Sequence, residues 1–227
     1  MVKTSKKTIL FEHPLIKDLY VDKIPGGTSP FFEQPFISYF TPLVLKGIIA
    51  DLGCGKGING FLIRLSRYLD GVKIIGVDIN EDYIKFCNKY NIYDEIIKKP
   101  LPRLSFKNKS IELVLCTGVM EHLRRKDGLK LLEEIDRVCK GRVIITTPNI
   151  FFPTQPGNPE DKHLSLWTIK DFQSRGYKVY GLGLKMPILW GDKLLKIKQA
   201  LYYFFTPISY LFPRISGTLV AIKDFSK

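Results

Sequence analysis

The chain has 227 residues, 45% of them hydrophobic, which suits one domain with a well-buried core. Lysine and arginine outnumber aspartate and glutamate by 35 to 22, and the net charge of +13 favours anionic partners such as nucleic acid, a phospholipid surface or an acidic metabolite. The four cysteines form no C-x-x-C pair, which argues against a zinc site or a disulfide framework and indicates a cytoplasmic protein. The first residues do not resemble a signal peptide.

Strand and helix patterns alternate along most of the chain. Residues 1–30 predict an irregular lead-in, and residues 31–227 predict a single domain. The predicted strands are 48–52, 73–78, 95–98, 111–116, 142–147, 177–184 and 218–223. The predicted helices are 36–45, 58–69, 81–90, 127–139 and 168–175. This alternation indicates an α/β fold with a doubly wound sheet, which binds ligands at the carboxyl ends of its strands.

Two of these helices are amphipathic, so each should turn its apolar face to the core. For helix 58–69 that face is Phe61, Leu62, Leu65 and Leu69. For helix 127–139 it is Leu129, Leu132, Ile135, Val138 and Cys139. Asn80 is the expected N-cap of helix 81–90, because two acidic residues follow it in the first turn.

The most informative segment lies where strand 48–52 ends. Asp51 is followed by Gly53, Gly55 and Gly57, and glycine permits the backbone angles needed where a strand turns directly into a helix. A loop without Cβ atoms also lets a ligand lie against the backbone. Asp78 ends the next strand and should point into the same crevice, since the strands of a βαβ unit are neighbours. Because a carboxylate there can accept both hydroxyls of a ribose, the segment predicts a cofactor that carries a nucleoside.

Two cofactor classes fit this geometry. Residues 55–60 satisfy the G-x-G-x-x-G pattern of dinucleotide sites, and Asp78 follows 18 positions after Gly60. A pyrophosphate has no use for the acid at Asp51, whereas a zwitterionic amino acid does. An NAD-linked oxidoreductase is therefore less favoured, and a domain whose glycines only form a turn is a further alternative.

The string Asp51-x-Gly53-x-Gly55-x-Gly57 resembles motif I of the class I S-adenosylmethionine-dependent methyltransferases, and the chain looks type 11/12-like. The resemblance implies S-adenosyl-L-methionine as cofactor. It implies that Asp51 holds the ammonium group of the methionine moiety, directly or through water, that the glycines face the cofactor and that Asp78 binds the ribose. It also implies a Rossmann-like methyltransferase fold with seven mostly parallel strands and an antiparallel last strand.

Further segments are similar to this family in the same order, over about residues 45–225. They are residues 104–114, 119–123, 146–149 and 163–177. Many members carry an acid after the third strand that binds the adenine amino group, but residues 98–101 contain none. Ile79, Leu101 and nearby backbone groups are therefore expected to hold the adenine.

Methyl transfer from a sulfonium mainly requires that the acceptor be positioned against the methyl group. A hydroxyl or ammonium acceptor must also lose a proton, and histidine is the usual base near neutral pH. Of the three histidines, His122 and His163 are expected at the pocket mouth and are the candidate catalytic bases. Either could instead pack or bond the backbone of its own loop. Glu121 and His122 could hold a divalent ion, as in some related O-methyltransferases, but the sequence assigns no metal site.

These features predict methyl transfer to a small-molecule or lipid-like acceptor, with oxygen as the favoured atom. An RNA methyltransferase is the alternative, supported by the net charge of +13 and opposed by the dispersed lysines. Residues 116–119 lack the Asn/Asp-Pro-Pro-aromatic tetrad of the base and glutamine N-methyltransferases, which argues against those chemistries. A non-catalytic cofactor-binding or membrane-surface scaffold is the alternative of another class.

Residues 185–216 form an insertion between the predicted sixth and seventh strands. Its apolar run is interrupted by Pro207 and is shorter than the roughly 20 residues of a membrane-spanning helix. The segment could be a substrate lid, an interfacial membrane helix over 192–213, a dimer surface or ordinary core packing. We favour a lid that shapes an apolar acceptor site and leave the oligomeric state open. The residues on one helical stripe are Leu194, Ile197, Leu201, Phe204 and Ile208.

Overall fold

The computed structural model describes residues 33–151, 162–185 and 195–225. The predicted lead-in and the first part of the insertion, 186–194, lie outside these ranges. The strands are β1 Val44–Leu52, β2 Tyr68–Asp78, β3 Glu95–Lys98, β4 Ile111–Thr117, β5 Cys139–Pro148, β6 Lys178–Leu182 and β7 Thr218–Asp224. The helices are α2 Gln34–Phe40, α3 Ile58–Ser66, α4 Glu81–Lys89, α5 Arg125–Val138, α6 Ile169–Gln173 and α7 Leu195–Leu211, with 3-10 turns η1 Met120–His122 and η4 Pro213–Ile215.

The strands form one seven-stranded sheet in the order β3-β2-β1-β4-β5-β7-β6. Neighbouring strands are parallel except where β7 pairs with β5 and β6. The chain order reverses between β1 and β4, and ligands bind at such a switch point because the loops there diverge. The predicted α/β fold, with its doubly wound sheet and antiparallel last strand, is confirmed.

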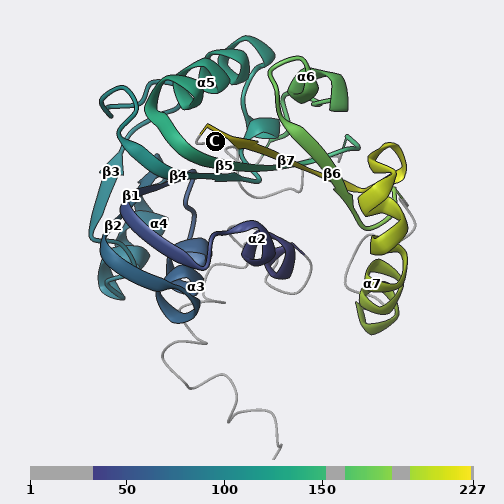
Figure 1. Cartoon of the computed structure of the whole chain (residues 1–227), viewed down its shortest axis with the longest axis horizontal. Coiled ribbons are helices and arrows are strands. Elements are labelled where there is room, and N and C mark those ends of the chain that lie inside the picture. Colours follow the sequence, from purple (N-terminus) through teal and green to yellow (C-terminus); the bar gives the residue numbers. More distant parts are fainter. Residues whose placement is uncertain (1–32, 152–161, 186–194, 226–227) are drawn as a thin grey trace, which may run out of the picture.

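Helices cover both faces of the sheet (Figure 1). α5 and α6 lie on one face, and α2, α3, α4 and α7 lie on the other. Each face has its own apolar core, the first around Leu132 and Trp167 and the second around Ile49 and Ile63. Strands β1 and β4 are near-continuous apolar runs at their carboxyl ends because helices cover them on both sides.

Helix α3 shows the clearest error of the sequence analysis. Its expected buried face is wrong, because Phe61 and Leu65 are 49% and 68% exposed. The helix packs instead through a face that includes Gly60 and Ile63. A Cβ at Gly60 would lie 2.5 Å from Tyr93 Cε1, so the missing side chain is what allows Tyr93 to pack against the helix. This packing rotates the Phe61 and Leu65 side to the surface.

Several element boundaries also differ from prediction. The helix expected at 58–69 ends at Ser66, since β2 begins at Tyr68 and pairs there with Val44 of β1. The same pairing starts β1 early, so the helix expected at 36–45 is α2 and ends at Phe40. The helix at 168–175 and the strand at 177–184 shorten to α6 and β6.

Two local predictions are confirmed. Asn80 caps α4, and its Oδ1 accepts hydrogen bonds from Asp82 N–H at 2.9 Å and Tyr83 N–H at 3.2 Å. The buried face of α5 contains Leu132 and Ile135, both fully buried, as expected.

Helix α7 is the described part of the insertion, and it packs on the edge strand β6. A Cβ at Gly183 would lie 2.5 Å from Tyr202 Cδ2, and one at Gly181 would lie 2.4 Å from Ser209 O. These two glycines therefore let the helix approach the strand closely.

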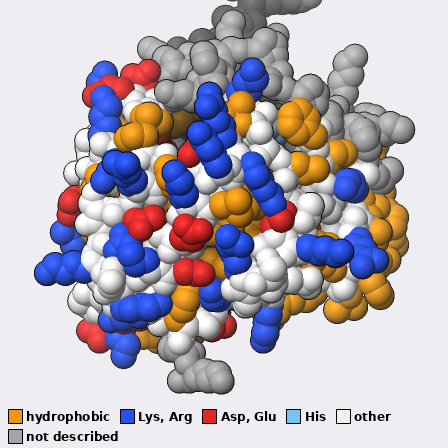
Figure 2. All heavy atoms as spheres, turned by 90° about the horizontal axis from the view of Figure 1, so that it is seen from above, with side chains coloured by type: hydrophobic (Ala, Val, Ile, Leu, Met, Phe, Trp, Pro, Cys, Tyr) orange, Lys and Arg blue, Asp and Glu red, His pale blue; other side chains and the backbone are white. Residues whose placement is uncertain are grey.

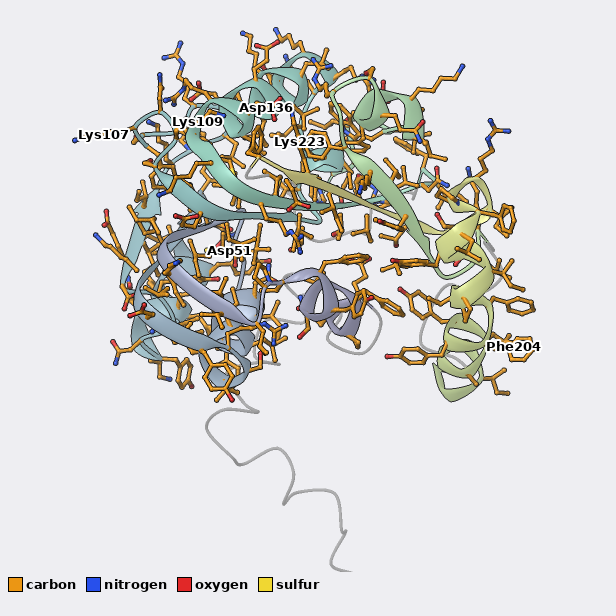
Figure 3. All side chains as sticks on the ribbon, in the orientation of Figure 1. Asp51, Lys107, Lys109, Asp136, Phe204 and Lys223 are labelled. Carbon is orange, nitrogen blue, oxygen red and sulfur yellow. The ribbon has the colours of Figure 1, made fainter. Side chains whose placement is uncertain are left out.

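The apolar stripe predicted for α7 faces solvent rather than the core. Ile197, Phe204 and Ile208 are 55%, 71% and 47% exposed, and Phe204 projects away from the sheet (Figure 3). Leu201 is half-buried, and Leu194 lies outside the described residues. Core packing is thus wrong for the outer part of this stripe. Among the described residues, no helix has both the length and the apolarity that crossing a membrane requires.

Candidate active site

The loop between β1 and α3 begins the candidate site at the carboxyl edge of the sheet. Gly53, Gly55 and Gly57 have φ values of +66°, +52° and +81°, which confirms the predicted conformational need for glycine. Gly53 also has a close neighbour, because a Cβ there would lie 2.4 Å from Val119 Cγ2. Val119 immediately precedes η1, so the glycine loop and that turn pack directly on each other. Contact of the three glycines with the cofactor stays a prediction.

Asp78 lies beside this loop at the end of β2. Its Oδ2 accepts a hydrogen bond from Gly55 N–H, and its Oδ1 accepts one from Asn80 N–H, both at 2.8 Å. Asp51 pairs with Gly76 in the parallel β1–β2 ladder, so both acids reach the same edge of the sheet. The structure therefore brings Asp78 to the glycine loop, and its binding of ribose stays a prediction.

Asp51 lies beneath the loop and is fully buried. Its Oδ2 accepts a hydrogen bond from Tyr93 Oη–H at 2.6 Å, and its Oδ1 accepts one from Asn59 Nδ2–H at 3.0 Å. Asn59 also donates to Thr117 Oγ1 at 2.9 Å and accepts from Gln34 Nε2–H at 2.9 Å. This network joins α2, α3, β1 and β4, and it fixes the orientation of the Asp51 carboxylate.

The surroundings of Asp51 favour its neutral form in the free protein. Burial raises its pKa to about 6, and the nearby Asp78 carboxylate adds to the rise. The hydrogen bonds from Tyr93 and Asn59 act in the opposite direction. A cation placed near Asp51, such as the ammonium group of a methionine moiety, would therefore stabilise its charged form.

The expected adenine side of the pocket lies where β2 and β3 end. Asp78 pairs with Lys98, and Lys99 N–H donates to Asp78 O at 2.9 Å. Ile79 is 49% exposed next to Asp78, and the half-buried Leu101 packs against the core. Both apolar side chains thus follow neighbouring strand ends, and their contact with adenine stays a prediction.

Turn η1 carries Glu121 and His122 just beyond β4. Glu121 is buried, and its Oε2 accepts a hydrogen bond from Thr147 Oγ1–H at 3.1 Å. Burial raises the pKa of Glu121 to about 8, with a further contribution from the Glu33 carboxyl group. The turn therefore places a buried acid next to the glycine loop.

Backbone hydrogen bonds fasten residues 164–167 to η1. Leu164 N–H and Ser165 N–H donate to Glu121 O at 2.7 and 3.1 Å. Trp167 is fully buried, and its Nε1–H donates to Met120 O at 3.0 Å. The segment before α6 consequently has a fixed position against the turn.

This arrangement brings the two predicted histidines together. The His122 and His163 ring centroids lie 5.0 Å apart at an interplanar angle of 74°. His122 Nε2 lies 4.0 Å from Glu121 Oε1, and its Nδ1 lies 3.4 Å from Lys162 O. Both rings are half-buried, so solvent or a ligand has access to them. A role for either as a catalytic base stays a prediction.

Four residues of the site are not evident from the sequence. Asn59 and Tyr93 orient Asp51, and Trp167 holds the segment after His163. Glu33 accepts hydrogen bonds from the hydroxyl groups of two threonines on β5 and β7, and burial raises its pKa. Only Asn59 had a usable signal, since it lies within the glycine-rich segment.

Comparisons with known proteins agree with this geometry. Residues 49–142 match the family model described as a methyltransferase domain. The carboxy-S-adenosyl-L-methionine synthase of Glaesserella parasuis is 32% identical over 149 residues, which are 57% of this chain and 61% of that relative. The chain therefore spans about three fifths of the length of this curated relative.

Solved structures share the fold. An S-adenosylmethionine-dependent methyltransferase from Archaeoglobus fulgidus is 20% identical with a TM-score of 0.55, covering 85% of this chain and 90% of that one. Phosphoethanolamine N-methyltransferase 2 from Haemonchus contortus, in complex with S-adenosyl-L-methionine, is 12% identical with a TM-score of 0.57, covering 96% of this chain and 59% of that one. The sheet order and the solved structures show the fold of the class I S-adenosylmethionine-dependent methyltransferases, and the family match gives residues 49–142 as a methyltransferase domain. S-adenosyl-L-methionine is the cofactor of this class.

Proposed function

We propose that this chain transfers the methyl group of S-adenosyl-L-methionine to an oxygen atom of a small-molecule or lipid-like acceptor. The observation that carries the transfer is the contact between the glycine loop and η1 through Gly53 and Val119. It puts the expected cofactor residues, Asp51 and Asp78, at the same edge as the candidate base His122. Donor and acceptor groups can therefore meet at one edge of the sheet.

The reaction is a displacement at the methyl carbon. The acceptor oxygen bonds to that carbon while the methyl–sulfur bond breaks, and the electron pair stays on sulfur as a neutral thioether. The proton of the hydroxyl group passes to a base, for which His122 and His163 are the candidates. The remaining contribution of the chain is to hold the two reactants in line.

Apolar side chains near the histidines support an apolar acceptor. Phe151 lies edge-on to His163 at a centroid distance of 6.4 Å and is 55% exposed. On the other side, Tyr202 of α7 packs against Phe36 of α2, with centroids 6.5 Å apart. Burial raises the pKa of Tyr202, and the nearby Glu33 carboxyl group raises it further, so the inner face of α7 lies near that acid. This placement supports α7 as a wall of the acceptor site.

We also propose that the protein is cytoplasmic and touches a membrane surface through residues 195–213, the described part of the predicted 192–213 segment. Phe204, Leu211 and Phe212 are 71%, 71% and 63% exposed, and Arg214 is exposed beside them. An apolar helical face with neighbouring cations suits the boundary between headgroups and acyl chains. In Figure 2, hydrophobic side chains gather at the right-hand edge, the side on which α7 lies in Figure 1.

Flotation with vesicles that contain anionic lipid tests the membrane contact. Phe204→Asp should reduce binding severalfold, whereas Phe61→Asp, at an exposed aromatic residue on α3, should leave it unchanged. If the unaltered protein does not float at low salt, the membrane contact is wrong. If both variants lose binding equally, α7 is not the contact surface.

The transfer itself is tested with S-adenosyl-L-methionine labelled in the methyl group and a cell extract split into lipid, small-molecule, RNA and protein fractions. We expect label in the lipid or small-molecule fraction, with S-adenosylhomocysteine as the second product. Asp78→Ala should strongly reduce the signal. Label in the RNA fraction alone would support the RNA methyltransferase instead, and cofactor binding without any product would support a non-catalytic scaffold.

One relative supports a second candidate function. The Glaesserella parasuis protein, 32% identical, is named for making a carboxylated form of the cofactor. Mass spectrometry of the cofactor in the same incubations separates the two activities. A carboxylated cofactor would identify the second activity, and S-adenosylhomocysteine would identify methyl transfer.

The distribution of charge does not favour RNA. On the face shown in Figure 2, lysine and arginine side chains are scattered among acids and hydrophobic groups rather than gathered in one patch. Nucleic-acid surfaces usually concentrate positive charge along one face. Retention of bulk RNA only at low salt would indicate nonspecific attraction.

A further inference from the structure

We propose that Glu121, His122 and His163 form a binding site for a divalent transition-metal ion. Each side chain offers one ligand atom, and these atoms lie within 4.8 Å of one another. One carboxylate and two imidazoles are the donor set of zinc sites that keep a coordination position open. Ligand atoms on a tetrahedral ion lie roughly 3.4 Å apart for bonds of about 2.1 Å. Small rotations of the two half-buried rings would therefore close the set on an ion.

The groups around these ligands orient them toward a common point. Thr147 occupies Oε2 of Glu121 and leaves Oε1 on the side of His122 Nε2, 4.0 Å away. His122 Nδ1 lies 3.4 Å from Lys162 O, so a proton on Nδ1 would donate to that carbonyl group and leave the Nε2 lone pair facing Glu121. Histidines that bind metals usually donate their other ring N–H in this way, which fixes the tautomer and the ring plane.

The backbone holds the two ligand-bearing segments in register. Glu121 O accepts hydrogen bonds from Leu164 N–H and Ser165 N–H, directly after His163. Trp167, fully buried, adds a bond from its Nε1–H to Met120 O at 3.0 Å. A metal site needs ligands whose positions are fixed before the ion arrives, and these bonds provide that rigidity.

The burial of Glu121 also suits a cation. Glu121 is 5% exposed, and within the described ranges no lysine or arginine forms an ion pair with it. Buried carboxylates are normally paired with a cation or coordinate a metal. A divalent ion between Glu121 and the histidines would stabilise the charged carboxylate.

An ion at this place would take an oxygen atom of the acceptor in its open position and favour loss of the hydroxyl proton to solvent. His122 and His163 would then act as ligands, and neither would serve as the base. This use of the ion rests on the proposed methyl transfer, whereas the site itself does not.

The test is a titration of Co²⁺ alone into the full chain, stripped of metal with a chelator and carrying no histidine tag. We expect one bound ion with visible absorption bands of low-coordinate cobalt. His122→Gln, His163→Gln and Glu121→Gln should each weaken binding by at least about 10- to 100-fold, the loss seen even for groups that only support a ligand. The remaining histidine of the chain supplies the matched control, since His13→Gln should leave the affinity unchanged. Thermal unfolding of each variant checks that it is folded.

Absence of binding, or an equal loss in His13→Gln, overturns the inference. Calorimetry with S-adenosyl-L-methionine on the same samples keeps the two proposals apart. Cobalt binding without cofactor binding would support the metal site and contradict the proposed methyl transfer. If the metal-stripped protein binds no cobalt but binds the cofactor and transfers methyl groups at the full rate, the methyl transfer is supported and the metal site is wrong.

Discussion

The affinity for S-adenosyl-L-methionine should depend on pH through Asp51. In the free protein, burial raises the pKa of this carboxyl group to about 6. The cofactor's ammonium group would favour the charged carboxylate and lower that pKa. The pKa of Asp51 in the folded protein lies above its ordinary value of 3.8. Asp51 therefore contributes stability to the free protein at pH values below 3.8, and this contribution is lost as the pH rises through about 6. Cofactor affinity should change in the opposite sense and increase over the same window.

The size of the effect follows from the fraction of Asp51 that is ionised. With a pKa of about 6, about one carboxyl group in eleven is charged at pH 5 and about ten in eleven at pH 7. The dissociation constant should therefore be about tenfold larger at pH 5 than at pH 7, or about 1.4 kcal/mol, if Asp51 stays charged in the complex. Tyr93, Cys54 and Cys116 also face Asp51, and burial or their buried neighbours raise the pKa of each, so they stay neutral over this range. Asp78 is the other acid close to Asp51.

Isothermal calorimetry in buffers of equal ionic strength between pH 5 and 7.5 measures this dependence. Asp51→Asn should abolish it. Tyr93→Phe is the sharper variant, because it removes a hydrogen bond that lowers the pKa of Asp51 and should move the midpoint to higher pH. An affinity that is constant across the range, with Asp51→Asn binding as tightly as the unaltered protein, would refute the contact between Asp51 and the ammonium group.

Three further predictions concern the residues around this site. Asp78→Ala should weaken cofactor binding by about 10- to 100-fold, as expected for hydrogen bonds to a charged group, and unchanged affinity in calorimetry would exclude the ribose contact. Gly53→Ala should lower the denaturation midpoint more than Gly71→Ala, and its loss of unfolding free energy should be about 1–3 kcal/mol larger. Both glycines have positive φ, but only at Gly53 would the new Cβ lie 2.4 Å from Val119. Equal losses would contradict the steric argument. Trp167→Phe should cost about 0.5–1.5 kcal/mol, because Met120 O loses its indole donor but keeps the Ser165 hydroxyl group. An unchanged urea midpoint would show that the indole bond is dispensable.

The sheet was predictable from sequence because its central strands leave few alternatives. Residues 48–52 and 111–116 are mainly apolar runs covered on both faces of the sheet. A strand can be predicted from such a run without knowing which face a given helix covers. Helix α3 was harder because its orientation is decided by a contact distant in sequence. Phe61 and Leu65 have the right spacing for a core face, but Gly60 lets Tyr93 pack against the other side.

The same reasoning applies to α7. Its stripe of apolar residues has the spacing of a core helix, yet Phe204 is 71% exposed. What fixes the helix is the close approach permitted by Gly181 of β6 and by Gly183, which follows that strand. Periodicity detects the apolar stripe, but it does not show whether the partner strand offers large side chains or glycines on the facing side.

The proposed cofactor and acceptor halves of the site differ in how far apart their residues lie in the chain. Asp51, the glycine loop and Asp78 belong to one βαβ unit, and their spacing is set by the geometry of that unit alone. Glu121 and His163 meet only because the segment before α6 bonds to η1, and Glu33 joins them from the start of α2. These interactions join residues up to 88 positions apart, and no local pattern encodes them. Under the proposed function, a change of acceptor would involve these distant segments, while the βαβ unit expected to bind the methyl donor could stay as it is.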